Sequence, residues 1–331
     1  MDSLLAMLSD TQPVSGEVLC QRLGMTRGAV WKRMEKLRQE GYQITACGKL
    51  GYRLDMAEDS LLPGYIEKEA GTRWAAQSQI EYAPAMESTN TTAKELARDG
   101  APHGTLVICN HQTAGRGRLQ RAWETPMGTA LTQSLVLRPS LSIEQAQLCT
   151  LAAAVATAQA IQQVCPGLTP GIKWPNDVVI GKRKCVGILS ELSADMDGIT
   201  YVIPGVGVNV NQTEFPQELA EKATSLLIEL RRQDPTARPV CRRKLLCAYL
   251  RHMEDAVDAL QENGFDGICQ EYLARSVTLG QQVHVMGANI DFVGMAQSID
   301  NTGALMVEDQ AGELRRVLCG DVSVRGMMGY C

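Results

Sequence analysis

The sequence predicts an α+β protein built from a winged helix-turn-helix, a mixed α/β domain and a small SH3-like β-barrel, in that order. Three observations support this prediction. Residues 1–60 contain short segments with helical apolar spacing and capping residues. Residues 61–275 mix strand-like and helix-like patterns, and residues 276–331 are short alternating segments separated by Gly, Asn and Asp turns. We therefore expect domain boundaries near residues 60 and 275.

Composition narrows the class of protein. The 331 residues are 45% hydrophobic and 21% charged, which is ordinary for a globular chain of two or three domains. No apolar run approaches the ~20 residues of a membrane span, and the N-terminus lacks a secretory-signal pattern. The 11 cysteines include no Cys-x-x-Cys pair and only four histidines occur, so we expect neither a metal site nor a disulfide framework. These features favour a cytoplasmic protein without a membrane partner.

The first segment is predicted to contain three helices. Residues 3–8 have the apolar spacing of a short first helix. The second helix is expected between an N-capping Ser15 and a C-capping Gly24, and the third begins after Thr26 and ends at Gly41. Two helices joined by a tight turn form a helix-turn-helix, which is a DNA-binding motif.

A two-stranded wing is predicted next, because residues 42–54 alternate in polarity around a Gly-rich turn. Residues 1–53 carry eight Lys/Arg and five Asp/Glu, a net charge of +3, whereas the rest of the chain carries −8. The basic N-terminal segment, which we call the head, is therefore the part of the chain suited to binding nucleic acid. The candidate DNA contacts are the side chains off the buried stripe of the third helix and one lysine near the wing tip: Arg27, Trp31, Lys32, Arg33, Lys36 and Lys49. The alternative is a small interaction domain with a solvated basic face.

The central segment predicts a largely antiparallel sheet, because several strand-like runs follow one another through hairpins. Strands are expected at residues 105–110, 130–137, 172–174, 177–180, 184–191 and 201–211, and helices at residues 91–99, 143–164 and 239–263. The known phosphate-loop patterns are absent, since no Gly-x4-Gly-Lys-Ser/Thr run occurs and Gly205-Val206-Gly207 lacks a third glycine at the required spacing. If this domain binds ATP, arginines and magnesium must hold the phosphates.

Two motifs carry most of the chemical information. Residues 115–121 hold three arginines and two glycines, followed by Ala122 and Trp123. Guanidinium groups bind phosphate and carboxylate in a bidentate way, and glycine lets the backbone approach a ligand closely. We therefore expect a basic loop that closes over an anion, although such a run alone could equally be a solvated or nucleic-acid-binding loop. Residues 173–177, Lys-Trp-Pro-Asn-Asp, place an amide and a carboxylate at a turn that follows a strand.

In this order, the two motifs resemble those of the biotin–protein ligases, the enzymes that adenylate biotin and attach it to a lysine of a carboxylase. The N-terminal segment is similar to the operator-binding head of the bifunctional ligase/repressors, and residues 276–331 resemble the family's C-terminal domain, which assists ATP and acceptor binding. The resemblance implies a central domain of the class II synthetase/biotin ligase type with biotin–[acetyl-CoA-carboxylase] ligase activity. It further implies ATP and biotin as substrates, Mg²⁺, a biotin carboxyl carrier protein domain as acceptor, operator DNA, and a homodimer when the adenylate is bound.

The resemblance also implies roles for individual residues. Lys184 matches the lysine that reaches the biotin carboxylate and the α-phosphate, and Asp177 matches the carboxylate near the metal and phosphates. The implied catalytic residues are Lys184, Arg116, Arg118, Arg121 and Asp177. The implied biotin-binding residues are Ser88, Thr89, Asn90, Gln112, Gly115, Arg116, Trp123, Lys184, Gly187 and Gly205. The implied nucleotide-binding residues are Arg118, Arg121, Asn176, Asn209 and Phe215.

Simpler interpretations exist for the same residues. Residues 88–90 could merely cap a helix, and Lys184 alone could be a solvated lysine at a strand edge. Two other functions also fit part of the pattern. A lipoate or octanoyl ligase would share the catalytic fold, but the run at residues 173–177 argues for biotin. A non-catalytic biotin-sensing repressor is disfavoured by Lys184 and by the intact arginine loop.

Overall fold

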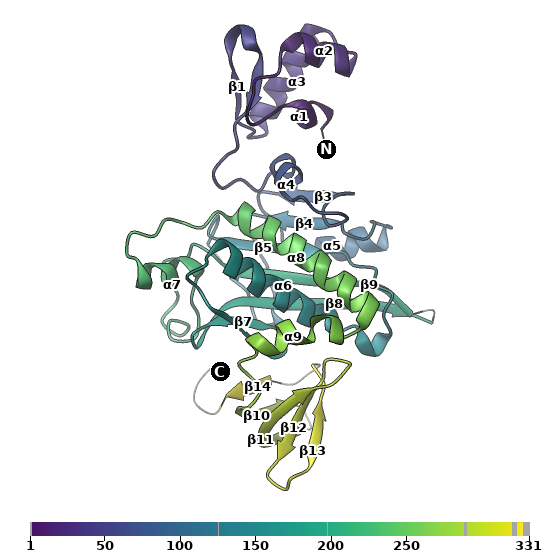
Figure 1. Ribbon diagram of the computed structural model, residues 1–331, viewed down its shortest axis with the longest axis vertical. Helices are drawn as coiled ribbons and strands as arrows, with labels where there is room; N and C mark the ends of the chain where they lie inside the picture. The colour runs from purple at the N-terminus through teal and green to yellow at the C-terminus, as the bar shows by residue number, and fades with distance from the viewer. Residues whose placement is uncertain (1, 125, 197, 288–289, 320–322, 327–331) are drawn as a thin grey trace. The chain divides into compact units, whose positions relative to one another are not determined.

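The computed structural model describes residues 2–124, 126–196, 198–287, 290–319 and 323–326 (Figure 1). It divides the chain into two compact units, Met1–Gly71 and Thr72–Cys331. The first unit extends past residue 60 because helix α4 (Pro63–Glu69) packs on the head. The Tyr42 hydroxyl accepts a hydrogen bond from the Gly64 N–H at 3.0 Å, and Tyr65 belongs to the same core cluster.

The first unit is a winged helix-turn-helix, as predicted. Its elements are α1 (Ser3–Met7), α2 (Gly16–Leu23), α3 (Arg27–Gln39), β1 (Ile44–Ala46) and β2 (Tyr52–Leu54). The Ser15 side chain caps α2 by accepting from the Val18 N–H, and Gly24 ends that helix in the left-handed conformation at φ 63°. Thr26 caps α3, and β1 pairs with β2 in antiparallel fashion. The capping and turn residues therefore set the helix boundaries here.

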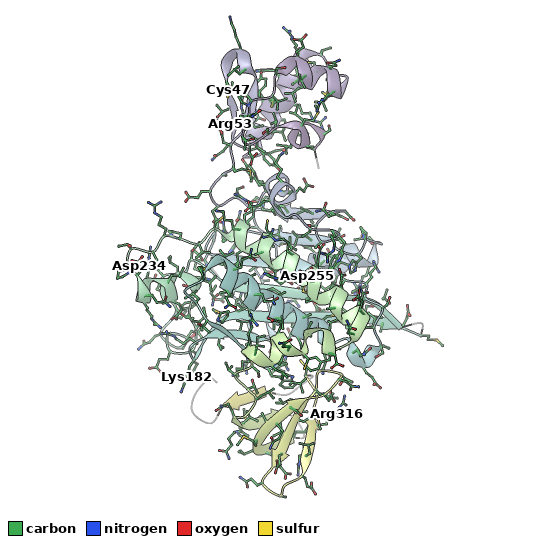
Figure 2. All side chains as sticks on the ribbon, in the orientation of Figure 1. Cys47, Arg53, Lys182, Asp234, Asp255 and Arg316 are labelled. Carbon is green, nitrogen blue, oxygen red and sulfur yellow. The ribbon has the colours of Figure 1, made fainter. Side chains whose placement is uncertain are left out.

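The second unit contains a seven-stranded sheet in the order β3-β4-β5-β9-β8-β7-β6. The strands are β3 (Ile80–Ala83), β4 (Leu106–Cys109), β5 (Ala130–Leu135), β6 (Pro170–Lys173), β7 (Asp177–Ile180), β8 (Arg183–Asp195) and β9 (Gly198–Asn209). Only the β3–β4 pair is parallel among these neighbours, so the prediction of a largely antiparallel sheet is confirmed. Lys182 lies at the turn between β7 and β8 (Figure 2).

Helices pack on the sheet from both sides. The helices of the second unit are α5 (Thr89–Arg98), α6 (Leu148–Val164), α7 (Leu226–Gln233), α8 (Arg242–Asn263) and α9 (Asp266–Arg275). Helices α6 and α8 lie against one face (Figure 1), where Thr150 of α6 bonds Ser190 of β8. Helix α5 packs through Ala93 and Ala97 on the alternate side chains of β4 and β9, and therefore on the opposite face. The single helix predicted over residues 143–164 is interrupted, because a short 3₁₀ turn precedes α6.

The C-terminal segment forms a second, five-stranded antiparallel sheet in the order β13-β12-β11-β10-β14. Its strands are β10 (Gln282–Gly287), β11 (Ile290–Ile299), β12 (Leu305–Asp309), β13 (Leu314–Val317) and β14 (Ser323–Gly326). This confirms the antiparallel sheet, and its closure into an SH3-like barrel stays a prediction. The segment is joined to the central sheet through Trp174, whose indole N–H donates to the Gly303 carbonyl at 3.0 Å. In the part of the chain that the structure describes, no helix is long and apolar enough to cross a membrane.

Candidate active site

Three glycines form a flat floor on the sheet face that carries α5. Gly187 of β8 pairs with Gly207 of β9, and Gly205 lies two residues earlier on β9. A Cβ at Gly187 would come within 2.8 Å of the Trp123 ring, and one at Gly207 within 2.6 Å of Trp123 Nε1. The indole of Trp123 therefore lies directly over this floor. Its buried N–H has no hydrogen-bond partner among the described residues.

A buried polar cluster lies at one end of the floor. Thr89 and Asn90 open helix α5, and the Ser134 hydroxyl on β5 lies 2.8 Å from Thr89 Oγ1 and 2.6 Å from Asn90 Oδ1. The Gln112 Oε1 accepts from the Thr89 N–H at 2.8 Å. The Ser88 side chain makes no capping hydrogen bond, so residues 88–90 do not simply cap helix α5. These side chains instead face one another across the sheet, as a ligand-binding cluster would.

Lys184 and Asp177 form an ion pair beside the floor. Their Nζ and Oδ1 atoms are 2.5 Å apart, and Lys184 Nζ is 5.6 Å from the Trp123 ring centroid. The register between β7 and β8 shifts at this point, because Val178 pairs with Val186 and Val179 pairs with Lys184. The bulge turns Lys184 toward the same face as the glycines.

The backbone of Lys184 is hydrogen-bonded to the segment that follows β9. Its N–H donates to the Lys222 carbonyl at 2.8 Å, and the Thr224 N–H donates to its carbonyl at 2.9 Å. With its side chain only 25% exposed, it is not a solvated edge lysine. The neighbouring Cys185 is a packed thiol, and burial raises its pKa well above the usual value.

The arginine motif forms a small loop closed on itself. The Gly117 N–H donates to the Arg121 carbonyl at 2.7 Å, and the Trp123 N–H donates to the Gly115 carbonyl at 2.9 Å. Arg118 is directed toward the site, where its guanidinium donates to Asn176 Oδ1 at 3.2 Å and to the carbonyl of Cys319 in the C-terminal segment. Arg116 and Arg121 are exposed on the loop surface, so the structure brings only Arg118 next to the Pro-Asn turn.

The remaining predicted nucleotide residues lie beside the segment that follows β9. The Asn209 amide donates to the Thr224 carbonyl at 3.1 Å and its Oδ1 accepts from Gln212 Nε2 at 3.1 Å, so Asn209 tethers this segment. Asn176 is buried and donates to the Ile188 carbonyl at 2.8 Å. Phe215 is half-buried in the same segment.

Gly205 differs from Gly187 in what it makes room for. A Cβ at Gly205 would lie 1.9 Å from Asn90 Oδ1, so in this structure it accommodates a protein side chain of the polar cluster. Sequence reasoning missed Ser134 and Glu191, which contact Asn90. Their signal was weak, because each is one of several polar residues within its strand. They can be recognised as site residues only because their side chains lie on the same face of the sheet as the glycine floor.

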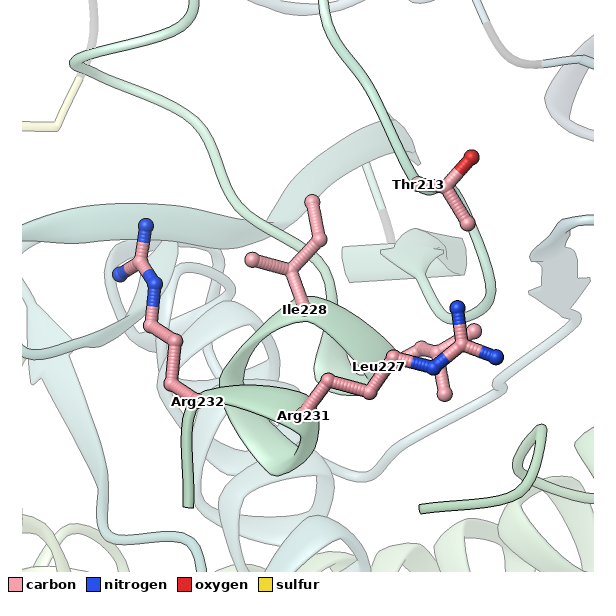
Figure 3. A pocket seen from close by; sticks show the side chains of 5 residues that line it. All are labelled: Thr213, Leu227, Ile228, Arg231 and Arg232. Atoms are coloured by element: carbon pink, nitrogen blue, oxygen red, sulfur yellow. The ribbon is translucent and has the colours of Figure 1, made fainter. Parts of the chain in front are cut away.

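The structure also shows a shallow cavity away from these residues. It is lined by Thr213, Leu227, Ile228, Arg231 and Arg232, with Ile228 between the two arginine side chains (Figure 3). No residue predicted for biotin or nucleotide binding lines this cavity. We therefore place the site on the glycine floor, which Trp123 and Asn90 partly fill.

The predicted DNA-binding residues of the head are mostly available to solvent. Arg27, Trp31, Lys32, Lys36 and Lys49 are exposed. Arg33 differs from these residues, because its guanidinium donates to Asp2 Oδ2 at 2.9 and 3.1 Å, and its contact with DNA stays a prediction. Partial burial would raise the pKa of Asp2, but the hydrogen bonds from Arg33 and from the Leu4 N–H, together with the charge of Arg33, outweigh it, and the pKa is lowered.

Fold and site together define an adenylate-forming protein ligase with a DNA-binding head, and comparisons with known proteins agree. Family models match residues 82–209 (biotin/lipoate A/B protein ligase family), residues 1–53 (HTH domain) and residues 278–325 (biotin protein ligase C terminal domain). The bifunctional ligase/repressor BirA of Bacillus subtilis is 37% identical over 313 residues, with 94% of each chain covered. The biotin–[acetyl-CoA-carboxylase] ligase of Mycobacterium tuberculosis is 32% identical over 258 residues, covering 76% of this chain and 90% of that protein.

A solved structure supports the same assignment. The biotin protein ligase from Aquifex aeolicus in complex with biotin and ATP superposes with a TM-score of 0.63 at 26% identity, covering 75% of this chain and 99% of that one. The chain belongs to the family of bifunctional biotin–protein ligases and repressors. The predicted fold class, ligase activity and helix-turn-helix head are thereby confirmed.

Proposed function

We propose that this protein uses the glycine floor to activate biotin with ATP and then transfers biotin to a lysine of a biotin carboxyl carrier domain. The observation that carries this proposal is the Lys184–Asp177 pair at the floor, with Arg118 and Asn176 beside it. This arrangement supports a role for Lys184 as the cation between two anions, the biotin carboxylate and the α-phosphate, which must approach each other. Lowering their mutual repulsion is the main electrostatic task of an adenylation site.

In the first half-reaction, a biotin carboxylate oxygen attacks the α-phosphorus and pyrophosphate leaves. Lys184 is held by Asp177 at 2.5 Å, so its ammonium is already oriented before the substrates bind. Arg118 is the second cation, and it would exchange its amide and carbonyl partners for phosphate oxygens. In the second half-reaction the carrier amine attacks the acyl carbonyl and AMP leaves, while the Asp177 carboxylate is placed to orient that amine.

Biotin binding requires the arginine loop to move. The flat rings of biotin need the surface that the Trp123 indole covers, because a Cβ at Gly207 would already contact that indole. The buried Trp123 N–H has no partner among the described residues, so little holds the indole in this position. We propose that Trp123 shifts and then forms the apolar wall of the occupied pocket, while the polar cluster of Thr89, Asn90 and Ser134 contacts the ureido ring.

We propose that ATP enters as its magnesium complex. Mg²⁺ prefers oxygen ligands and usually retains water, with one or two carboxylates and the substrate phosphates as its other ligands. The described residues include no group of three His, Cys, Asp or Glu side chains that could hold a metal. Asp177 is the carboxylate at the site, so it fits the role of the single protein ligand to a metal carried by ATP.

The head and the catalytic unit suggest a further level of function. We propose that the helix-turn-helix binds operator DNA as part of a homodimer that forms when the adenylate is bound. A single head with a net charge of +3 is a weak anchor, and two heads on a two-fold site multiply affinity. The free thiols of the described cysteines fit the reducing cytoplasm in which such a protein would work.

The direct test is mass spectrometry of a biotin carboxyl carrier domain after incubation with this protein, ATP and biotin. We expect one biotin on the target lysine, and no modification when ATP is omitted. The matched control replaces biotin with lipoate. Lipoyl transfer in preference to biotin, or no transfer with either ligand, would contradict the proposed activity.

A further inference from the structure

We propose that Glu191 is a positioning residue for ligand recognition, which fixes the direction of the hydrogen bonds in the polar cluster so that the cluster offers acceptors to ligand N–H groups. This inference rests on the proposed function, with biotin as the ligand. Glu191 lies on β8, on the same face as Gly187 and Leu189, because alternate residues of a strand share a face. Its Oε2 accepts from Asn90 Nδ2 at 3.1 Å.

Glu191 and the Leu189 carbonyl together determine which way the Asn90 amide points. The two amide protons of Asn90 are directed to the Leu189 carbonyl at 3.0 Å and to the Glu191 carboxylate at 3.1 Å. Both partners are acceptors, so only the NH₂ end can face them. Asn90 is 6% exposed, and its oxygen rests against Gly205, which leaves the amide little room to rotate. Asn90 Oδ1 must therefore accept, and its donor is the Ser134 hydroxyl at 2.6 Å.

The direction then passes to Thr89. Ser134 is the donor in its 2.8 Å contact with the Thr89 hydroxyl, as it is in its contact with Asn90 Oδ1. The Thr89 hydroxyl in turn donates to Gln112 Oε1 at 3.1 Å. The single proton of Thr89 therefore stays within the cluster. Toward a ligand, Thr89 Oγ1 can offer only lone pairs.

The resulting pattern selects a class of ligand. The bonds from Ser134 to Asn90 and from Asn90 to Glu191 both run toward a carboxylate, which polarises them and makes the Ser134 oxygen at the far end a better acceptor. The ureido ring of biotin carries N–H donors that match this end, whereas a dithiolane ring such as that of lipoate carries none. A site with buried acceptors rejects a ligand that lacks the matching donor, because those groups would be left unpaired. Glu191 thereby acts on specificity without touching the ligand.

Lys94 provides a matched control. Its Nζ lies 2.6 Å from Glu191 Oε1, the oxygen that does not bond Asn90. Both side chains of this ion pair are about one third exposed, at 35% and 30%. Lys94→Gln removes the ion pair but keeps the carboxylate and its bond to Asn90. Glu191→Gln keeps the size of the side chain but replaces an obligate acceptor with a group that can also donate, so the Leu189 carbonyl alone then holds the orientation of the Asn90 amide.

The experiment measures adenylation by the full-length protein through pyrophosphate release, at varied biotin and at varied ATP. For Glu191→Gln we expect KM for biotin to rise about tenfold, as for one mismatched buried hydrogen bond. We expect kcat at saturating biotin and KM for ATP to change less than about twofold, because neither reports the ureido contacts. Lys94→Gln should keep the wild-type KM for biotin within about twofold. An unchanged KM for biotin in Glu191→Gln, or an equal rise in Lys94→Gln, would overturn the proposal.

A second readout separates positioning from a structural role. Calorimetric titration with biotin and with an N-methylated biotin, which lacks one ureido donor, gives the discrimination between the two ligands. Wild type should prefer biotin, and Glu191→Gln should lose most of that preference. If Glu191→Gln does not fold, Ser134→Ala breaks the same chain at its far end and should lose the same discrimination. Full discrimination in the variant tested would refute the role of Glu191, whereas a wild type that forms no biotinyl-adenylate would refute the proposed function instead.

Discussion

Gly205→Ala tests whether the polar cluster is as tightly built as the geometry implies. A Cβ at this position would lie 1.9 Å from Asn90 Oδ1 and 2.7 Å from Asn90 Cγ, which is too close for either atom to stay. Asn90 must leave its place, because the Cβ belongs to the middle of a paired strand. The matched control is Gly207→Ala, two residues along the same face, where the displaced group is the Trp123 indole.

The expected magnitudes follow from what each displaced side chain loses. Asn90 gives up hydrogen bonds to Ser134, Leu189 and Glu191, at about 1 kcal/mol each, so Gly205→Ala should lower the free energy of unfolding by about 3 kcal/mol. The Trp123 N–H has no partner among the described residues, and its loop is closed by few bonds. Gly207→Ala should therefore cost only about 1 kcal/mol.

Equilibrium urea unfolding followed by tryptophan fluorescence measures this difference. Three of the four tryptophans, Trp74, Trp123 and Trp174, belong to the second unit, so the signal reports mainly on it. Similar slopes with a lower midpoint for Gly205→Ala would agree with the reasoning. A midpoint equal to wild type, or a smaller loss than in Gly207→Ala, would show that Asn90 is not held by the bonds described.

Four further predictions test the reaction and its regulation. Lys184→Ala should leave folding intact and slow pyrophosphate release on the order of a hundredfold or more by removing a transition-state cation; near-normal release by a folded variant would exclude Lys184 from the mechanism. Arg118→Gly should weaken retention of the adenylate more than biotin binding, seen by mass spectrometry as labelled lysines on bystander proteins, and a selective variant with lost biotin affinity would contradict this role. Proteolysis within residues 116–121 should be fast without ligand and slow with biotinyl-adenylate, and equal cutting would argue against a closing loop. Sedimentation should show a shift from monomer to dimer when biotin and ATP are added, and the dimer should bind operator-like DNA more tightly, with a strong dependence on salt. A dimer that forms without ligand and binds DNA equally well would falsify the coupling between adenylate formation and DNA binding.

Local patterns in the sequence determined the head and the elements of the sheet. Ser15, Gly24 and Thr26 set helix ends through bonds within a few residues, and such short-range signals survive in any tertiary context. The arginine loop and the Pro-Asn turn were likewise visible, because each motif is contiguous. The extension of the head to Gly71 was not visible, since it depends on α4 packing against residues about 20 to 60 positions away.

Only the tertiary structure decided which side chains meet at the site. The position of Lys184 depends on a register shift between β7 and β8, and one residue of register moves a side chain to the other face of a sheet. Asn90, Ser134 and Glu191 come from one helix and two strands that are not adjacent in the sheet, so no sequence spacing links them. Helical periodicity puts Arg33 off the buried stripe of its helix, but it does not indicate the hydrogen bonds that Arg33 donates to Asp2, thirty-one residues away. Sequence spacing encodes contacts along one element, whereas hydrogen-bond partners across elements depend on how the strands and helices are packed.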